Sequence, residues 1–346
     1  MNEETIVPKK RKRPFLRFLA FLGVTLLCIV AVLLGAIWVL ERGPSPTVTG
    51  MFTRSVRETS AIRWISNIFL TDLELEQYKS VSTEDQMTEA VNTSLIHVAE
   101  GTPVLETGDA VQLIDIAEGT CKGKLLIVAD PKQVILGVSD EFVKQPGLQL
   151  TDMVAKYDGI AGINAGGFND ENGTGNGGIP QGLVIYNGEI TWGDGYTPYH
   201  MVGLDKDGIL HVGAMSGNDA VEQGILWAVS FVTHDGLASS LIINGEVQRQ
   251  NLGGGVNPRT ALGQREDGAL LLLVLDGRSI NTLGATMEDV VNIMLEYGAV
   301  NAGNLDGGSS SVMVYDGEII NHCASVTGPR RIPTGFIVLK EGASNA

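Results

Sequence analysis

The stretch "TMEDVVNIMLEYGAVNAGNLDGGSSSVMVYDGE", Thr286–Glu318, contains the clearest folding signals in the chain. Thr286, with an acid three residues later, is a helix N-cap signal, and Gly298 is typical of the residue that follows a helix end. An apolar stripe at helical spacing lies between them. The stretch therefore predicts a helix over 286–297, a short strand, the polar turn "LDGGSSS" and a hairpin.

A second segment has the same order of features. "LTDMVAKYD" at 150–158 is closed by Gly159 and leads through the apolar "IAGIN" into the polar turn "NAGGFND". We predict a helix here as well. Each predicted helix thus precedes a strand that ends in turn residues, where binding and catalytic side chains are often found.

The remainder of the chain after about residue 94 indicates antiparallel strands. Apolar runs flank Asn-Gly or Asp-Gly pairs in "LVIYNGEITW", "VGLDKDGILHV", "LIINGEV" and "VMVYDGEII". A type I′ turn needs positive φ at both central residues, so these pairs are strong hairpin signals. The predicted fold class is α+β, with mixed but largely antiparallel sheets and a few packed helices.

The N-terminal segment predicts a membrane anchor. Residues 18–40 contain no charge, and about 20 apolar residues suffice for a helix to cross a bilayer. Six basic residues within 9–17 precede them, which favours a cytoplasmic N-terminus. A cleavable signal peptide is the alternative, although its apolar core is typically only about 7–15 residues long. We expect a basic tail over 1–17, a transmembrane helix over 18–40, and a linker with a helical stalk over 41–93.

The part beyond the predicted span is acidic. Residues 1–40 hold six of the 24 basic residues and two of the 40 acidic ones, so the remainder has a formal charge of −20. Such a charge disfavours nucleic acid and anionic lipid as general partners. Cys28 lies in the predicted span, which leaves Cys121 and Cys323 as the two cysteines able to pair in an oxidising compartment.

Standard catalytic and metal-binding patterns are missing from the sequence. The chain has neither G-x-S-x-G nor G-x-x-x-x-G-K-[ST], and its five histidines are scattered. The polar stretch "NDENGTGNGG", 169–178, has the composition of a calcium loop without its residue order. We expect a surface loop there, no metal ion and no cofactor.

Five polar blocks lie next to apolar runs, and each block alone is typical of a turn. They are "NAGGF" from Asn164, "NPRTALG" from Asn257, "LDGRS" from Leu275, "LDGGSSS" from Leu305 and "GPRRIPTGF" from Gly328. Together they contain Arg259, Arg278, Arg330 and Arg331. The planar fork of arginine matches phosphate or carboxylate, so a cluster in an acidic domain indicates a recessed anionic ligand. Asp276 and Asp306 each end an apolar run, where pKa shifts are expected.

The succession "GINAGGF", "NPRTALG", "LLVLDGR", "TMEDVVNIMLEYGAVNAGNLDGGSSSVMV" and "RRIPTGF" resembles the phosphodiester glycosidase family over roughly residues 108–339. The resemblance implies hydrolysis of a sugar 1-phosphodiester, in which the bond from the anomeric carbon to a phosphate oxygen breaks. A free sugar and a phosphomonoester are the products. The polar insert that ends at Gly178 departs from this likeness, so the identity of the substrate does not carry over.

The resemblance also implies roles for the polar blocks. Asp306 is the expected catalytic carboxylate, which steadies an oxocarbenium-like transition state or activates water, with Asp276 as its partner. The other expected site residues bind phosphate or sugar groups. They are Asn164, Arg259, Arg278, Gly307, Gly308, Ser309, Ser310 and Arg330.

We therefore expect residues 94–346 to form an extracytoplasmic phosphodiester glycosidase-like domain that acts on cell-envelope or exopolysaccharide glycans. Its expected partners are a sugar phosphodiester or other anionic glycan and, through residues 18–40, the lipid bilayer. The alternative is a non-catalytic protein that uses the same pocket to bind an anionic glycan during exopolysaccharide or cell-wall assembly.

Overall fold

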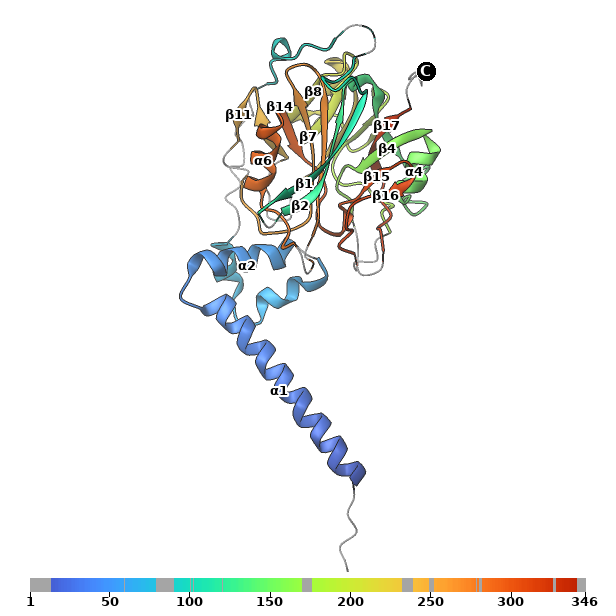
Figure 1. The fold of residues 1–346 in the computed structure, drawn as a ribbon. Helices are drawn as coiled ribbons and strands as arrows, with labels where there is room; N and C mark the ends of the chain where they lie inside the picture. Colours follow the sequence, from blue (N-terminus) through green and yellow to red (C-terminus); the bar gives the residue numbers. More distant parts are fainter. Residues whose placement is uncertain are drawn as a thin grey trace, which may run out of the picture.

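The computed structural model describes most of the chain. The described residues are 14–58, 60–78, 90–99, 101, 103–119, 121–169, 176–231, 239–248, 252–277, 279, 282–325 and 328–340. Figure 1 shows a long N-terminal helix, a small group of helices and a β-rich domain in succession.

The N-terminal helix α1 (Pro14–Arg42) extends away from the rest of the protein (Figure 1). Its apolar window is not buried inside the protein. By length and composition this helix is able to cross a membrane, a property that signal sequences near an N-terminus share. The first 13 residues, which hold most of the predicted basic tail, lie outside the described residues.

Short helices follow α1 and form what we call the helical unit, the described residues within 46–78. It consists of α2 (Pro46–Glu58), the 3₁₀ helix η1 (Ser60–Asn67) and α3 (Asp72–Glu76). The 41–93 segment predicted as linker and stalk is thus helical in separate pieces, the first of which begins at Pro46. Residues 79–89 of the predicted stalk lie outside the described residues.

The largest sheet has seven strands in the order β1-β2-β13-β12-β14-β10-β11, and every neighbouring pair is antiparallel. In chain order the strands are β1 (Val111–Glu118), β2 (Cys121–Val128), β10 (Ser240–Ile243), β11 (Glu246–Val247), β12 (Arg259–Arg265), β13 (Leu270–Leu275) and β14 (Ala299–Asn304). Strand β13, the run "LLLLVL", is buried on both faces, which explains why it shows no alternation of apolar and polar residues.

Two five-stranded antiparallel sheets complete the domain, in the orders β16-β15-β4-β17-β3 and β6-β5-β9-β7-β8. The first contains β3 (Val134–Val138), β4 (Gly159–Asn164), β15 (Met313–Tyr315), β16 (Glu318–Ile319) and β17 (Thr334–Leu339). The second contains β5 (Val184–Tyr186), β6 (Glu189–Trp192), β7 (Pro198–Asp205), β8 (Leu210–Ser216) and β9 (Ile225–Ser230). The predicted α+β class with largely antiparallel sheets is confirmed.

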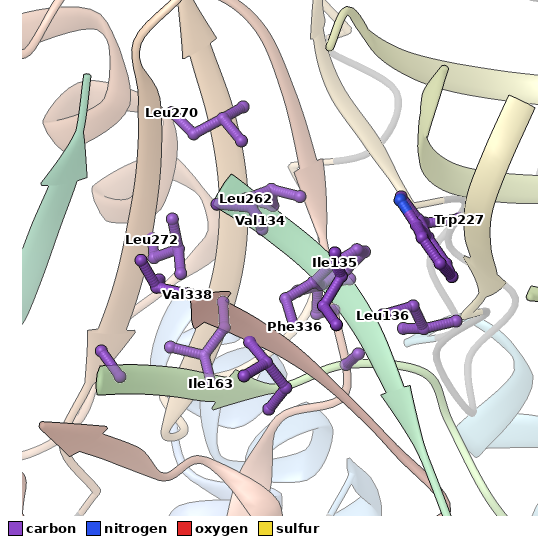
Figure 2. Packing of buried hydrophobic residues seen from close by; sticks show 14 of the residues in the cluster. Val134, Ile135, Leu136, Ile163, Trp227, Leu262, Leu270, Leu272, Phe336 and Val338 are labelled. Carbon is purple, nitrogen blue, oxygen red and sulfur yellow. The ribbon is translucent and has the colours of Figure 1, made fainter. Parts of the chain in front are cut away.

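All three sheets share one apolar core. Figure 2 shows Leu262 and Leu272 of the seven-stranded sheet close to Ile163 and Val338 of the β4–β17 sheet, with Trp227 from the third sheet nearby. A second cluster lies on the opposite face of the seven-stranded sheet, where helix α6 (Met287–Glu296) packs. The seven-stranded sheet is therefore covered on both faces.

The two helices predicted from sequence are present as α4 (Leu150–Lys156) and α6. In α6 the Asp289 N–H donates to Thr286 Oγ1 at 3.1 Å and the Thr286 N–H donates to the Asp289 carboxylate at 2.7 Å. This reciprocal capping box satisfies two backbone donors at the helix start, as the sequence predicted. Each helix leads directly into a strand, β4 or β14.

Three of the four predicted hairpins have two-residue turns with positive φ at both positions, at Asn187-Gly188, Asn244-Gly245 and Asp316-Gly317. The fourth, between β7 and β8, has a longer loop in which only Gly208 has positive φ. There the Asp205 carboxylate accepts the N–H groups of Asp207 and Ile209, both at 2.9 Å. This side-chain acceptor closes the loop in place of a type I′ turn.

Candidate active site

Polar strand ends meet at one edge of the seven-stranded sheet. Strand β12 begins at Arg259, opposite Leu275 at the end of β13, and Ala261 pairs with Asn304 at the end of β14. Because these neighbours are antiparallel, the start of β12 and the ends of β13 and β14 share the same edge. The blocks "NPRTALG", "LDGRS" and "LDGGSSS" therefore converge.

Asn164 connects the β4 block to this edge. Its carboxamide is fully buried, and Nδ2 donates to the Asp306 carbonyl oxygen at 2.5 Å. Oδ1 accepts from Thr260 Oγ1 at 2.9 Å and from the Val312 N–H at 3.0 Å. The expected sugar contact is thus replaced by three hydrogen bonds within the protein, and Asn164 fixes the backbone that carries Asp306.

The loop that carries Asp306 is held on several sides. The Asp306 N–H donates to the Ala165 carbonyl at 2.9 Å, and the Gly308 N–H donates to the Pro258 carbonyl at 3.0 Å. Gly308 has φ of +62°, and residues Gly308–Ser310 form one 3₁₀ turn. A Cβ atom on Gly307 would lie 2.9 Å from the Pro258 oxygen. Glycine at 307 therefore allows the close approach of two backbones.

The Asp306 carboxyl group is enclosed by protein while the residue keeps partial solvent exposure. Burial raises the pKa of Asp306 to about 7, and hydrogen bonds with the Ser310 side chain and the Gly307 backbone act in the opposite direction. A carboxyl group with this pKa exchanges a proton readily near neutral pH, which suits a general acid or base.

Asp276 follows β13 and is half-buried beside the same loop. Its backbone N–H donates to the Lys122 carbonyl at 2.7 Å, and its Oδ1 accepts the His322 N–H at 2.9 Å. Burial raises the pKa of Asp276, with hydrogen bonds from His322 and Asn321 acting against the rise. Asn321 also donates to the Ser311 carbonyl at 3.2 Å, so one side chain links Asp276 to the Asp306 loop.

Arg330, from the block "GPRRIPTGF", also lies at the site. Its Nη1 donates to Ser309 Oγ at 3.3 Å and to Ser310 Oγ at 3.5 Å. The guanidinium lies over the Phe168 ring, 4.7 Å from the ring centroid. Burial lowers the pKa of Arg330 from its very high ordinary value, and the group keeps its charge at neutral pH. Asp306, Ser310 and Arg330 are therefore neighbours, joined through the Ser310 hydroxyl.

Arg259 has a different environment from Arg330. Its Nε donates to the Ala285 carbonyl at 3.2 Å, its Nη2 donates to the Gly255 carbonyl, and Nη2 lies 3.0 Å from a carboxylate oxygen of Glu58 in α2. The side chain is almost fully buried. Arg259 was expected to bind the substrate phosphate, but these protein groups engage its guanidinium, so we place it in the scaffold behind the site.

The amides of the "DGG" turn are also engaged by protein groups. The Gly307 N–H is hydrogen-bonded to the Asp306 carboxylate and the Gly308 N–H to Pro258, which removes the two backbone donors expected to bind substrate oxygens. The Ser309 and Ser310 hydroxyls lie beside Arg330, and their binding of substrate stays a prediction. Arg278, the remaining predicted ligand, lies outside the described residues.

Sequence reasoning missed three residues with clear contacts at or behind the site: Phe168, Asn321 and Glu58. Phe168 follows the "NAGG" turn, and an aromatic residue there was the one local signal available. Asn321 contacts Asp276 and Glu58 contacts Gly255, which are far away in sequence, and no local pattern marks them.

The two cysteines expected to be able to pair are not joined to each other. Cys121 Sγ donates to the Gly284 carbonyl at 3.5 Å and Cys323 Sγ to the Ser309 carbonyl at 3.8 Å. Within the described part of the chain, no group of three or more His, Cys, Asp or Glu residues is placed to hold a metal ion. Most of the polar loop over 169–178 lies outside that part.

The model of the phosphodiester glycosidase family matches residues 157–339, more than half of the chain, and contains all the site residues described above except Glu58. The chain belongs to this family of hydrolases. The chain is 26% identical to bovine N-acetylglucosamine-1-phosphodiester alpha-N-acetylglucosaminidase over 172 residues. This match covers 44% of this chain and 32% of the bovine protein.

A second relative matches a shorter part of the chain. An SPbeta prophage-derived uncharacterized protein of Bacillus subtilis, YomE, is 44% identical over 66 residues, which cover 19% of this chain and 10% of that protein. The chain therefore spans about a third of the bovine relative and a tenth of the bacterial one.

The solved catalytic domain of zebrafish N-acetylglucosamine-1-phosphodiester alpha-N-acetylglucosaminidase, auto-inhibited by its pro-peptide, has the same fold with a TM-score of 0.56. The identity is 21%, and the match covers 71% of this chain and 87% of that domain.

Proposed function

We propose that this protein hydrolyses sugar 1-phosphodiesters in cell-envelope or exopolysaccharide glycans and releases a free sugar and a phosphomonoester. The observation that carries the proposal is that Asp306 and Arg330 lie close together, with Ser310 in contact with both. Burial raises the pKa of Asp306 to about 7. A proton-exchanging carboxyl beside a fixed cation is what hydrolysis of an anionic diester requires. Family membership supports the same reaction class.

In the proposed reaction a water molecule adds to the anomeric carbon and gives its proton to the Asp306 carboxylate. The bond from the anomeric carbon to the bridging phosphate oxygen breaks, and the phosphomonoester leaves with the bonding electrons. Positive charge that develops on the sugar ring is also stabilised by a carboxylate nearby. Asp276, which is tied to the same loop through Asn321, is the proposed second carboxyl group.

We propose that Arg330 binds the phosphate, because its position over Phe168 and against Ser309 holds the guanidinium in one place. A planar cation held in this way matches two oxygens of a phosphate. The Ser309 hydroxyl is placed to donate to the same group. Arg259 and Asn164 then act behind the substrate by fixing the loop that carries Asp306.

We further propose that α1 anchors the protein in a membrane as a single span, with a cytoplasmic N-terminus and the β-rich domain on the outer side. Support comes from the length and apolar composition of α1 and from the basic residues that precede it in the sequence. Its continuation without a break to Arg42 favours an uncleaved anchor over a signal peptide.

The test is incubation of the full-length protein in detergent with methyl diesters of N-acetylglucosamine, glucose and galactose 1-phosphates, followed by assay of free reducing sugar. We expect release from at least one of them, with Asp276→Asn slower than wild type. Tight binding of a diester with no release by the wild-type protein would favour the non-catalytic glycan binder instead.

A further inference from the structure

The end of α1 is fixed to the helical unit by a dense set of polar contacts. Arg42 donates to the Phe69 carbonyl from Nε at 3.0 Å and from Nη2 at 2.6 Å, and its guanidinium pairs with Glu74. The Phe69 N–H donates to Glu41, which is 2% exposed, at 3.2 Å. The hydrogen bond from Arg42 lowers the pKa of Glu74 to about 2. Helix α1 is therefore joined to the unit at a defined angle.

The helical unit is in turn joined to the β-rich domain through Glu58. One carboxylate oxygen of Glu58 accepts the Gly255 N–H at 3.0 Å, and the other contacts Arg259 and Asn257. The Val256 N–H donates to Ser55 Oγ at 2.8 Å. The Glu58 side chain is only 9% exposed, so this contact is an enclosed one.

The segment that α2 contacts, residues 255–257, leads into the site. Residues 255–257 precede Pro258, whose carbonyl accepts the Gly308 N–H of the Asp306 loop. The helical unit therefore lies at the end of the domain that carries the site, between that end and α1 (Figure 1).

The helical unit exposes large apolar side chains near the end of α1. Leu73 is 83% exposed and is next to Glu74, the partner of Arg42, while Trp64 of η1 is 66% exposed. Tryptophan is enriched at the level of lipid headgroups, where its ring meets both apolar and polar surroundings. Helix α1, which the unit follows in the chain, is itself lined with exposed apolar side chains.

From this arrangement we propose that the helical unit seats the domain on the bilayer surface through Trp64 and Leu73. The site then acts on sugar 1-phosphodiesters whose alcohol part is a membrane lipid. The inference rests on the proposed function for its substrate. Since the domain is acidic, the seating depends on apolar insertion and works on a zwitterionic surface.

The test uses the full-length protein in phosphatidylcholine vesicles and two diesters of each sugar 1-phosphate, one with methanol and one with hexadecanol. The hexadecyl diester resides in the bilayer and the methyl diester in water. We expect Trp64→Ala with Leu73→Ser to lower kcat/KM for the hexadecyl diester about fivefold, because an apolar side chain no longer enters the interface. Turnover of the methyl diester stays at the wild-type value.

The matched control is Tyr196→Ala with Val104→Ser, which removes an aromatic and an aliphatic side chain of similar exposure, 86% and 58%, from the β-rich domain and the segment leading into β1. We expect this control variant to hydrolyse both diesters with the wild-type kcat/KM. Equal turnover of the hexadecyl diester by wild type and the Trp64/Leu73 variant overturns the proposal, and so does an equal loss on both diesters. If wild type hydrolyses neither diester, the proposed function fails, and the seating is decided by fluorescence.

That second measurement is quenching of tryptophan fluorescence by phosphatidylcholine brominated near the headgroup. The difference between wild type and Trp64→Phe isolates the emission of Trp64 from the other three tryptophans. We expect this component to be strongly quenched. A Trp64 component with the same intensity in brominated and ordinary vesicles overturns the seating, whatever the activity.

Discussion

Two aspartate–glycine pairs lie ten residues apart in the chain, Asp306-Gly307 and Asp316-Gly317, and they have different surroundings. Asp316 and Gly317 are exposed, both have positive φ, and they form the turn between β15 and β16. Asp306 is enclosed, with its backbone held by Ala165 and Asn164. The same dipeptide thus forms an exposed turn in one place and, where long-range contacts enclose it, carries the carboxyl group that we propose as catalytic.

The largest expected difference between the two pairs is in activity. Asp306→Asn removes the group that exchanges a proton, so we expect kcat to fall about a thousandfold. Asp316→Asn, which makes the same chemical change in the hairpin turn, is expected to leave kcat at the wild-type value. Release of reducing sugar from a sugar 1-phosphodiester measures both. Similar kcat values for the two variants would mean that Asp306 has no special role in the reaction.

The second difference is in the pH dependence of stability. The pKa of Asp306 is raised from 3.8 to about 7 in the folded protein, so the folded state binds more protons between these values. The free energy of unfolding contributed by this group therefore falls as pH rises through this window. The Asp306→Asn variant has no such fall. Its free energy of unfolding, relative to that of wild type, should therefore increase from pH 4 to pH 8 by up to about 4 kcal/mol.

Urea unfolding of both proteins at the two pH values measures this gain. Asp316→Asn, measured in the same way, shows whether removal of any carboxylate beside a glycine gives the effect. A stability difference between wild type and Asp306→Asn that is the same at both pH values would mean that the carboxyl group is not enclosed as described.

Arg330, the proposed phosphate ligand, lies beside the Asp306 loop and provides a further test of the site. We expect Arg330→Gln to raise KM roughly tenfold to a hundredfold, because a charge-assisted contact is lost. Arg265→Gln is the control, since Arg265 lies at the other end of β12 and pairs with Asp267. Steady-state kinetics on the preferred diester gives both values, and an unchanged KM for Arg330→Gln would move phosphate binding to another group.

The smallest expected effects are those of alanine substitutions at Gly307 and Gly317. Gly317 has φ of +79°, so Gly317→Ala should lower the free energy of unfolding by about 1 kcal/mol and leave activity intact. Gly307 has φ of −113°, which alanine tolerates, but its Cβ would press on Pro258. Gly307→Ala should therefore lower activity more than Gly317→Ala does, as measured by urea unfolding and kcat together. The reverse order would contradict the assignment.

Much of the fold follows from local sequence signals. The capping box at Thr286, Gly298 after α6 and three Asn-Gly or Asp-Gly turns act within a few residues, so their structures could be predicted. After α4 the left-handed residue is Asp158, and Gly159 already begins β4. Asp207-Gly208 was the exception, because the Asp205 side chain supplies an alternative acceptor that a dipeptide signal does not include.

The site was predictable in outline, because polar blocks at strand ends meet when the strands are antiparallel neighbours. The roles of Arg259 and of the Gly308 amide depend instead on which partner lies next to them. Arg259 meets Glu58 and Gly308 meets Pro258, and both contacts join segments far apart in the chain. Composition and spacing give no information on such pairings.

The most direct test of the central claim is hydrolysis of a sugar 1-phosphodiester in water labelled with heavy oxygen. If the Asp306 site delivers water to the anomeric carbon, mass spectrometry will find the label in the released sugar and none in the phosphomonoester. Label in the phosphomonoester, together with a free sugar that keeps its original unlabelled anomeric oxygen, would show attack at phosphorus and contradict the account.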